Sequence, residues 1–413
     1  MKTVNWDRKP LGAVADLCLG KMLDQNKNRG DLFPYLANVN VRWGEFDLND
    51  LRTMRFEAHE MERYGLKFGD IVMCEGGEPG RCAIWRDQLP GMMIQKALHR
   101  IRPKELLDYQ FLFYNLLHIG KTKQFDQYFT GATIKHLPGE KLAKVEVDIP
   151  PLPIQRRIAG ILSSYDKLIE NSQRRIKILE AMARALYREW FVHFRFPGHE
   201  SVPRVPSPLG DIPKGWEVKT VADAFEISGG GTPSRKVEAF WEGGTIQWYS
   251  PSDLTGAGTM FMDDSSDHIT NEGLAQSSAR MFPARSVMLT SRATIGAIAI
   301  NTQPACTNQG FITCLPNDRV PLYLQFHWLK ENVPTYQRMA SGATFKEISR
   351  GVFKTIEFLQ PTDDLSEKFE ATAAPMAEQI LALQRQIQNL RRTRDLLLPR
   401  LLLGRVDLAT EAA

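Results

Sequence analysis

Amide, hydroxyl and basic side chains gather in short loop-like segments of the chain. Loops that present such groups can hydrogen-bond base edges in a DNA groove or pair with phosphates. In the first half of the chain the candidates are Lys21, Asn26, Lys27, Asn28, Arg29, Thr133 and Lys135. In the second half they are Ser234, Arg235, Lys236, Arg292, Thr294, Asn308, Gln309, Thr344 and Lys346. A solvated loop explains each residue singly, but loops in matching places of both halves favour DNA recognition by the group.

Motifs that would form an enzyme active site are missing from the sequence. There is no G-x-x-x-x-G-K-[ST] phosphate loop, and Gly229-Gly230-Gly231-Thr232-Pro233 has a proline where a dinucleotide fingerprint would open a helix. Ile149-Pro150-Pro151-Leu152 lacks the flanking residues of an amino-methyltransferase tetrapeptide. No acidic pair with a nearby lysine indicates a nuclease, and none of the eight histidines lies in a catalytic motif. We therefore expect a non-catalytic chain.

The cysteines also fail to form a recognisable site. There are five of them, Cys18, Cys74, Cys82, Cys306 and Cys314, and they are never spaced as C-x-x-C. An odd number without metal-ligand spacing is typical of reduced, packed thiols. We therefore expect neither a disulfide framework nor a bound metal.

Composition leaves the question of partners open. The chain has 413 residues, of which 43% are hydrophobic and 24% charged, and its formal net charge is +4. A charge this small neither requires nor excludes nucleic acid, because a DNA-binding protein can place its cations on one face. No apolar run approaches the ~20 residues of a membrane span, and the N-terminus lacks the apolar stretch of a secretory signal. These features predict a cytoplasmic protein.

The sequence repeats itself with one offset. Gly131-Ala132-Thr133-Ile134-Lys135 recurs 211 residues later as Gly342-Ala343-Thr344-Phe345-Lys346, and Trp216 follows Trp6 by 210. Similarity between these anchors is faint. Short apolar runs such as 71–74 and 287–290 predict strands, whereas 109–119 and 322–339 predict helices. We expect two mixed α/β blocks of roughly 145 residues, a comfortable size for one core.

Each block is followed by a long apolar seam. Positions that alternate in steps of four and three are Ile158, Leu162, Tyr165, Ile169, Ser172, Ile176, Leu179, Ala183, Leu186 and Trp190. The same walk shifted by 211 gives Phe369, Ala373, Met376, Ile380, Leu383, Ile387, Leu390, Arg394, Leu397 and Leu401. A repeat of 3.5 residues over nearly five heptads is typical of a coiled coil. Each helix should have ~40 residues and be ~60 Å long.

Proline-rich segments mark the boundaries of these parts. Pro150-Pro151-Leu152-Pro153 precedes the first helix, Pro361 precedes the second, and the run 202–208 is typical of a linker. We predict a first recognition domain at 1–149, a central spacer helix at 150–195, a linker at 196–214, a second recognition domain at 215–360, a C-terminal spacer helix at 361–404 and a tail at 405–413. The repeat predicts a pseudo-two-fold, near-circular arrangement with antiparallel helices.

The two helices carry more apolar surface than one seam can bury, notably at Trp190-Phe191 and in the run 396–403. Partner helices packing there would explain the excess. The candidate partner-binding residues are Ile158, Leu162, Ile169, Ile176, Leu179, Leu186, Trp190, Phe191, Ile380, Leu383, Ile387, Leu390, Leu397 and Leu401.

Four segments resemble the specificity subunits of type I restriction–modification systems, the HsdS family. Residues 151–162 (PLPIQRRIAGIL) and 179–191 (LEAMARALYREWF) are similar to the start and end of that family's central spacer helix. Residues 210–216 (GDIPKGW) resemble the start of its second recognition domain, and 397–402 (LLPRLL) its C-terminal spacer. Departures are modest, such as Gln155-Arg156 where an acidic residue usually precedes the glutamine.

The resemblance implies two α/β recognition domains, each reading half of a bipartite site in double-stranded DNA. It implies two methyltransferase subunits as partners and, through them, restriction subunits. Methylation of adenine N6 would use S-adenosylmethionine held by the methyltransferase, and ATP and Mg would belong to the restriction partner. This chain would bind no cofactor. The alternatives from the residues alone are a coiled-coil scaffold whose heads bind protein, and an enzyme with an unrecognised site.

Overall fold

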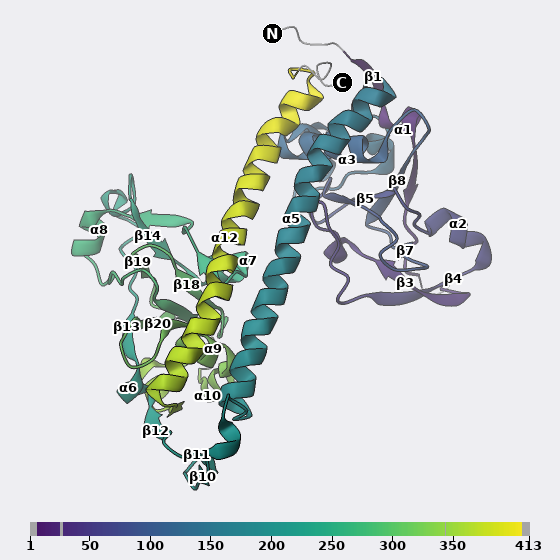
Figure 1. The fold of residues 1–413 in the computed structure, drawn as a ribbon. Helices are drawn as coiled ribbons and strands as arrows, with labels where there is room; N and C mark the ends of the chain where they lie inside the picture. The colour runs from purple at the N-terminus through teal and green to yellow at the C-terminus, as the bar shows by residue number, and fades with distance from the viewer. Residues whose placement is uncertain (1–5, 25–27, 343, 407–413) are drawn as a thin grey trace, which may run out of the picture. The chain divides into compact units, whose positions relative to one another are not determined.

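The chain folds into two compact units. The computed structural model describes residues 6–24, 28–342 and 344–406 (Figure 1). Unit 1 consists of the described residues of 1–170 together with those of 388–413, and unit 2 consists of the described residues of 171–387. Two long helices, α5 (Leu152–Tyr187) and α12 (Asp363–Leu402), each contribute to both units.

Unit 1 has a four-stranded sheet in the order β2-β8-β5-β6, a three-stranded sheet β4-β3-β7 and the pair β1-β9. Its strands are β1 (Asp7–Pro10), β2 (Ala15–Leu19), β3 (Asp31–Leu36), β4 (Arg52–Phe56), β5 (Ile71–Cys74), β6 (Cys82–Ile84), β7 (Met93–Ile94), β8 (Leu98–Pro103) and β9 (Glu146–Ile149). Its shorter helices are α1 (Leu11–Val14), α2 (Met61–Tyr64), α3 (Tyr109–Lys121) and α4 (Gly139–Leu142).

Both faces of the central sheet are covered in unit 1. Successive side chains of a strand point to opposite faces. Ile71 and Met73 of β5 accordingly belong to one apolar cluster and Val72 and Cys74 to another. This explains why β5 is a continuous apolar run in the sequence rather than an alternating one.

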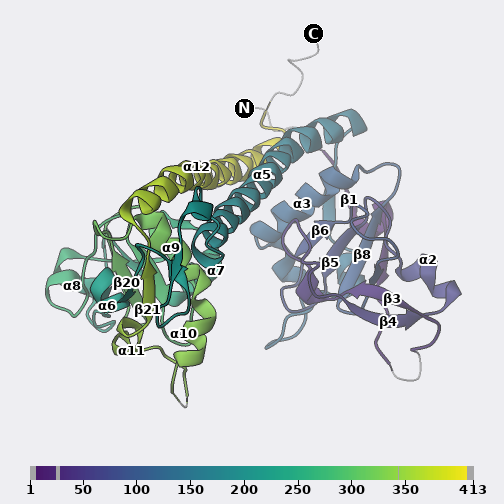
Figure 2. The same cartoon turned by 60° about the horizontal axis from the view of Figure 1, so that its bottom comes forward.

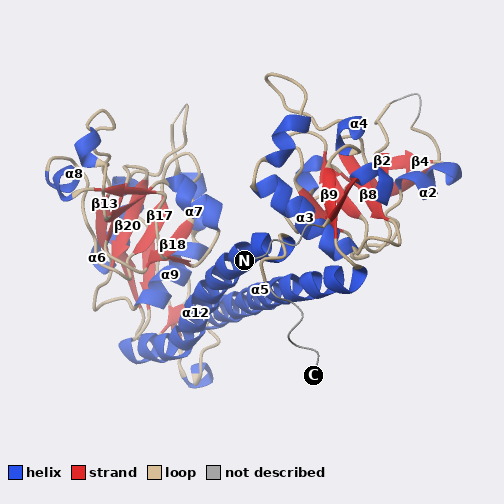
Figure 3. Ribbon diagram, turned by 90° about the horizontal axis from the view of Figure 1, so that it is seen from above, coloured by secondary structure: helices blue, strands red, loops and turns tan. Residues whose placement is uncertain are grey.

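Unit 2 repeats this plan. Its strands are β10 (Arg204–Val205), β11 (Ile212–Pro213), β12 (Glu217–Thr220), β13 (Glu226–Gly229), β14 (Ile246–Tyr249), β15 (Phe261–Met262), β16 (Asp267–Ile269), β17 (Val287–Thr290), β18 (Ile298–Asn301), β19 (Ala305–Thr307), β20 (Phe311–Leu315) and β21 (Glu357–Gln360). Its helices are α6 (Val221–Ala224), α7 (Pro251–Ala257), α8 (Asn271–Ala275), α9 (Leu322–Glu331), α10 (Val333–Met339) and α11 (Arg350–Lys354). Figure 2 shows α9 and α10 in this unit, and Figure 3 shows the strands of its main sheet side by side.

Apart from β15 and the pair β10-β11, the described strands of unit 2 match those of unit 1 in their order. The main sheet of unit 2, β13-β20-β17-β18-β15, is that of unit 1 with β15 added at one edge. The sheet β16-β14-β19 corresponds to β4-β3-β7, with one antiparallel and one parallel pairing in each case. The pair β12-β21 corresponds to β1-β9. The repeat that two short motifs indicated in the sequence is therefore a repeat of the whole topology.

The predicted seams are buried along both long helices. None of the ten seam positions of either helix is exposed. In unit 1, Asp166 of α5 pairs with Arg394 of α12, and towards the start of α5 Ile158 and Leu162 share an apolar cluster with Leu398 and Leu401. Residue numbers fall along α5 as they rise along α12, so these segments run antiparallel.

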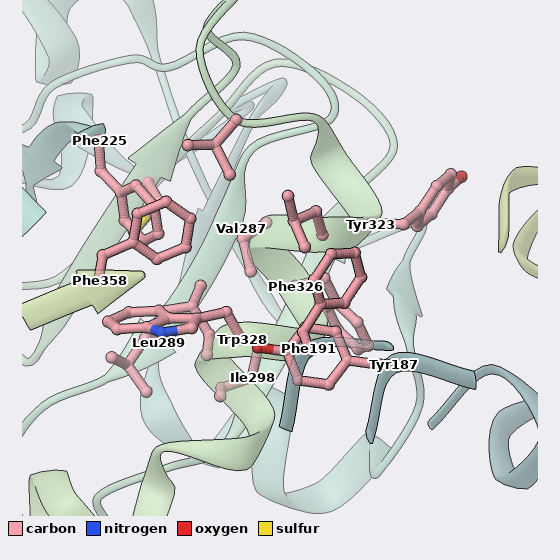
Figure 4. Close-up of a cluster of buried hydrophobic side chains, with 14 of the residues drawn as sticks. Tyr187, Phe191, Phe225, Val287, Leu289, Ile298, Tyr323, Phe326, Trp328 and Phe358 are labelled. Carbon is pink, nitrogen blue, oxygen red and sulfur yellow. The ribbon is translucent and has the colours of Figure 1, made fainter. Parts of the chain in front are cut away.

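In unit 2 the end of α5 packs into an aromatic core. The ring of Phe369 on α12 lies 6.0 Å from that of Tyr187 and 5.0 Å from that of Phe191. Figure 4 shows Tyr187 and Phe191 next to Phe326 of α9. After Tyr187 the helix widens into a π-helical turn, Arg188–Val192, which carries Trp190 and Phe191 into this core.

Two further observations bear on the sequence predictions. All five cysteines are free thiols. No helix in the described part of the chain is both long and apolar enough to cross a membrane.

Candidate nucleic-acid interface

Four loops of unit 2 converge at one end of its main sheet. Since β17 and β20 are antiparallel and pair Thr290 with Phe311, the end of one strand meets the start of the other. The Ser291 N–H donates to the Gly310 carbonyl oxygen at 2.8 Å, and the Gly231 N–H to that of Thr307 at 2.9 Å. The Ala293 N–H donates to Lys346 O at 3.0 Å. We call the loops 230–236, 291–296, 308–310 and 341–347, without residue 343, the loop edge of unit 2.

The same backbone hydrogen bonds build a loop edge in unit 1. Here the Glu75 N–H donates to Ala97 O at 2.8 Å, the Lys21 N–H to Ile94 O at 3.1 Å and the Leu137 N–H to Glu75 O at 2.8 Å. The counterpart of that last bond in unit 2 joins Ile348 to Ser291 at 2.9 Å. We call the loops 20–24, 28–30, 75–80, 95–97 and 130–136 the loop edge of unit 1.

Most candidates of unit 2 are exposed on its loop edge. Thr294, Gln309, Thr344, Lys346, Ser234 and Lys236 are exposed, and Asn308 is half-buried. The Asn308 Oδ1 accepts from the Gly310 N–H at 2.8 Å, and Gln309 Oε1 accepts from the Thr232 hydroxyl at 2.6 Å. Asn308 therefore shapes its own turn, while its neighbours face solvent.

The two arginines of this edge are positioned differently. Arg235 stacks on Trp241, with 3.5 Å between the guanidinium carbon and the ring centroid, and pairs with Asp267. Among the described residues, the ion pair of Arg292 is a long one, 3.7 Å from its Nε to the Glu347 carboxylate. Arg235 is thus held against its own unit, whereas Arg292 keeps donors for a ligand.

The placement of Lys21 is at odds with its predicted DNA contact. Its side chain is 4% exposed, and the ammonium pairs with Glu60 and donates to Arg55 O at 3.0 Å. Burial would raise the pKa of Glu60, but hydrogen bonds from Lys21 and from the Glu57 backbone hold it below its usual value. Lys21 therefore ties the loop to β4 and to the turn at 58–60.

The remaining candidates of unit 1 divide in three ways. Asn26 and Lys27 lie outside the described residues. Asn28 Oδ1 accepts from the Arg55 N–H at 2.8 Å, which is a structural contact. Arg29 and Thr133 are exposed, as is Lys135, whose Nζ lies 3.7 Å from Asp126 Oδ2. Arg29, Thr133 and Lys135 are the described side chains of this set that remain available to DNA.

Sequence reasoning passed over two residues on these edges. Ile134 and Phe345 occupy the fourth position of the repeated pentapeptide and are 65% and 58% exposed. Their place in the repeated pentapeptide could have identified them. They are missing from the candidates because an apolar side chain has no hydrogen-bonding group.

The predicted partner-binding residues lie inside the chain. Ile158, Leu162, Ile169, Trp190, Phe191, Ile380, Leu383, Ile387 and Leu401 are buried, and Ile176, Leu179, Leu186, Leu390 and Leu397 are half-buried. Other apolar side chains of α5 face solvent, with Ile178 52% and Met182 50% exposed. Any partner that docks on these helices meets residues such as these rather than the seam.

Among the described residues there is no group of three or more His, Cys, Asp or Glu side chains placed to hold a metal ion. The loop edges instead offer hydroxyl, amide and cationic donors. Such donors suit base edges and phosphates.

Comparisons with known proteins agree with this geometry. The family described as "Type I restriction modification DNA specificity domain" matches residues 3–181 and 213–364. The MjaIX specificity subunit of Methanocaldococcus jannaschii is 26% identical over 81% of this chain and 77% of its own length. The HindI specificity subunit of Haemophilus influenzae is 23% identical over 97% of this chain and 100% of its own length.

A solved structure shares the fold. The S subunit of the type I restriction–modification system from M. genitalium superposes with a TM-score of 0.58 at 16% identity, and the match covers 97% of both chains. The family match extends over both units and most of their residues, which favours DNA recognition over the scaffold and enzyme alternatives. The chain therefore belongs to the family of type I restriction–modification specificity subunits, the non-catalytic components that recognise the DNA target sequence.

Proposed function

We propose that each loop edge reads one half of a bipartite DNA target and that the long helices set the gap between the halves. The observation that carries this proposal is the duplication of the loop edge, built by equivalent backbone hydrogen bonds at the end of equivalent strands. Two edges of one design but different side chains suit two half-sites of different sequence. Phosphate contacts would position each edge and base contacts would specify the sequence.

The DNA-contacting residues that we propose are the exposed candidates on the edges other than Arg235, which Trp241 and Asp267 hold in place. In unit 1 they are Arg29, Thr133 and Lys135, and in unit 2 they are Ser234, Lys236, Arg292, Thr294, Gln309, Thr344 and Lys346. Arg292 is the strongest choice for a base, because arginine can bond two acceptors of guanine at once.

We propose further that methyltransferase subunits dock on the solvent-facing side of the long helices. Ile178 and Met182 lie one turn apart on α5 and are half exposed, and neighbouring apolar residues of this kind mark a protein contact. Two such subunits would hold S-adenosylmethionine and methylate adenine N6 in each half-site. Restriction subunits, with ATP and Mg, would join through the methyltransferases. We propose a cytoplasmic location for this complex, as expected of a restriction–modification system.

Mapping modified adenines tests the proposal directly. DNA is sequenced for N6-methyladenine from cells that express this chain with its methyltransferase subunit, and from cells that express the methyltransferase alone. We expect one bipartite motif with a fixed unspecified gap, present only in the first sample. Methylation at a single uninterrupted motif, or the same motif without this chain, would show that the chain does not read two half-sites.

Binding measurements then test the residues. Alanine at Arg29, Lys135, Arg292 or Lys346 should weaken binding of the mapped duplex by about ten- to a hundredfold for a base contact and less for a phosphate contact. Lys104→Ala is the matched control, since Lys104 follows the last residue of β8 while the loop edge lies at the first. Equal affinity of all four variants and the control would reject this choice of residues.

A further inference from the structure

The two loop edges share one feature that base reading does not explain. Ile134 and Phe345 stand at the same position of the repeated pentapeptide, and their side chains are 65% and 58% exposed. A large apolar side chain left in water forgoes the free energy that its burial would contribute. That both copies of the loop keep a large apolar side chain in water points to a contact made outside the chain.

The backbone holds each apolar side chain in place. Thr130 and His136 exchange two hydrogen bonds, of 2.8 and 2.9 Å, across the first loop. Ser341 and Glu347 exchange the same two bonds, of 3.0 and 2.8 Å, across the second. Five residues lie between the partners in each case, so the two loops close in the same way.

A glycine is needed to close each loop. Gly131 has a φ of +92° and Gly342 a φ of +127°, values that other residues rarely adopt. A Cβ atom at Gly131 would collide with the carbonyl oxygen of Ile134, and one at Gly342 with that of Phe345. We call Ile134 and Phe345 the tips of these loops. Each loop holds its own tip in place before any ligand binds, which lowers the entropy lost on binding.

The surroundings of the tips suit a polyanion. Lys135 and Lys346 follow the apolar residues directly, and Thr133 and Thr344 precede them, all four exposed. Ala293 donates to Lys346 O, which places the second tip beside Arg292 on the same edge. An apolar side chain next to cationic and polar groups is an arrangement with which proteins enter a DNA groove and wedge between base pairs.

The recurrence of the pentapeptide bears on what Ile134 and Phe345 could do. The other loops of the two edges differ in sequence, as Lys21–Asp24 and Gly231–Lys236 illustrate, whereas Gly-Ala-Thr-(Ile or Phe)-Lys is common to both. Residues that distinguish two half-sites must differ between the edges. A loop that both edges share serves a purpose that both half-sites share.

We propose that Ile134 and Phe345 are wedges that press into one base step of each half-site and partly unstack it, independently of its sequence. The inference rests on the proposed reading of DNA by the loop edges. Lys135 and Lys346 bind the phosphates that flank the step. A partly unstacked step also lowers the cost of extruding a neighbouring base, which enzymes that modify bases must do.

The test uses the full chain with its methyltransferase subunits and the duplex identified by methylation mapping. The variants are Ile134→Ala, Phe345→Ala and their double variant, with Ile134→Leu and Phe345→Leu as conservative replacements. Leu209→Ala is the matched control, an exposed apolar residue in the linker, 47% exposed. Because all of these side chains are exposed, the melting temperature should stay at the wild-type value, which separates binding effects from misfolding.

Two readouts are decisive. Removal of each wedge should weaken binding about tenfold, as expected when an apolar side chain or an aromatic ring loses its contact with a base, and by the same factor on the target and on a scrambled duplex. With 2-aminopurine placed at successive positions of one half-site, the wild-type complex should raise its fluorescence at one step. That increase should vanish only in the variant of the corresponding unit and persist in the leucine variants.

Three results would overturn the inference. Unchanged affinity and fluorescence would show that the tips do not touch DNA. Loss of the methyltransferase from the purified complex, with DNA binding by the chain intact, would show that the tips bind protein. A change of preference at a single base would show that they read sequence. If wild-type protein fails to prefer the target over the scrambled duplex, it is the proposed reading function that has failed.

Discussion

Arg394 interrupts the apolar seam of α12, and its surroundings in unit 1 explain why it is tolerated there. Its guanidinium pairs with Asp166 of α5 and, at 2.9 Å, with Asp395. The Tyr114 hydroxyl donates to the other oxygen of Asp166. Burial would lower the pKa of Arg394, but the carboxylates of Asp166 and Asp395 raise it. The charge is thus neutralised where it lies and joins the two helices to α3.

Removing one member of this cluster should destabilise unit 1. Arg394→Met leaves the Asp166 carboxylate, 17% exposed, without its cation, and loss of one partner of a buried pair costs about 3–5 kcal/mol. Urea unfolding measures the change. Arg394→Met with Asp166→Leu should recover part of it, since the buried Tyr114 hydroxyl then lacks its acceptor. Lys368→Met, in an exposed pair with Asp364, should shift stability by less than about 0.5 kcal/mol. A single variant as stable as this control would show that the cluster is dispensable.

His327 makes the stability of unit 2 depend on pH. The ring is 6% exposed and lies 5.8 Å from that of Tyr187 and 6.0 Å from that of Phe369. Burial, together with the cations Lys330 and Arg184, lowers its pKa from 6.5 to about 4. In the unfolded chain His327 is protonated below about pH 6.5, whereas in the folded chain it stays neutral down to about pH 4. Stability contributed by neutral His327 is therefore present above pH 6.5 and is lost as the pH falls towards 4.

His327 should determine how steeply the free energy of unfolding falls with decreasing pH. The wild-type chain should lose on the order of 3 kcal/mol between pH 6.5 and pH 4 through this group, and His327→Phe should lose correspondingly less. Unfolding by urea at a series of pH values measures both. His193→Phe, at an exposed position, should keep the wild-type slope. Parallel curves for wild type and His327→Phe would contradict the assignment.

At the scale of elements, the long helices were the part of the fold most open to prediction. A seam is a local pattern, because apolar residues recur at a fixed spacing on each turn of the helix. Tyr165 and Ser172 were the less apolar members of the first seam, and both are at least half-buried. The bounds were less predictable, since Arg188–Val192 continues α5 as a π-helical turn to place two aromatic rings.

The loops show the opposite behaviour. Lys21 is a charged residue in a polar segment, which is typical of a solvated loop. Its side chain is nevertheless buried and bonds to Glu60 and to the Arg55 carbonyl oxygen. Its partners lie 39 and 34 residues away in the sequence, so no local pattern could reveal them. For the same reason, the sequence could supply a set of DNA-contacting candidates but not separate the exposed from the structural ones.

Lengthening the helices should lengthen the DNA gap. Four residues inserted into each of α5 and α12 add one step of four to the seam, which locally unwinds the helix pair, and add ~6 Å, which is roughly two base pairs at ~3.4 Å each. Methylation mapping should therefore find the same half-sites about two base pairs further apart. Four residues inserted into the linker at 203–209 should leave the gap unchanged. An unchanged gap after the helix insertions would mean that the helices do not determine it.

At the scale of the whole molecule, the two units are variations on one topology. A single offset in the sequence predicted them, because two matching motifs were enough to align the halves. The predicted bounds kept the helix at 361–404 apart from both blocks, whereas residues 388–406 belong to the first unit, as antiparallel helices would place them. The residue at which each long helix passes from one unit to the other could not be predicted, because the seam pattern continues unchanged across it. The near-circular arrangement stays a prediction.

Independent loop edges imply independent half-sites. Arg292→Ala should relax the sequence requirement in one half of the methylated motif and leave the other half intact, whereas Arg29→Ala should affect only the other half. Discrimination at the affected position should fall by about 1–3 kcal/mol. Methylation mapping with each variant measures both halves in one experiment. Relaxation of both halves by one substitution would show that the units do not read separately.

Unit 1 is formed by segments from both ends of the chain, and this determines when it can finish folding. The Trp6 indole N–H donates to the Leu402 carbonyl oxygen at 3.0 Å, and Leu398 and Leu401 lie in the same core as Leu11 and Phe111. A ribosome makes the N-terminal part first, so the first unit to be translated is the last to be completed. A nascent chain that stops before residue 388 leaves Ile158 and Leu162 without these partners and exposed to proteases. Proteolysis of incomplete chains would then leave mainly molecules that contain both units, so that few incomplete molecules would bind DNA.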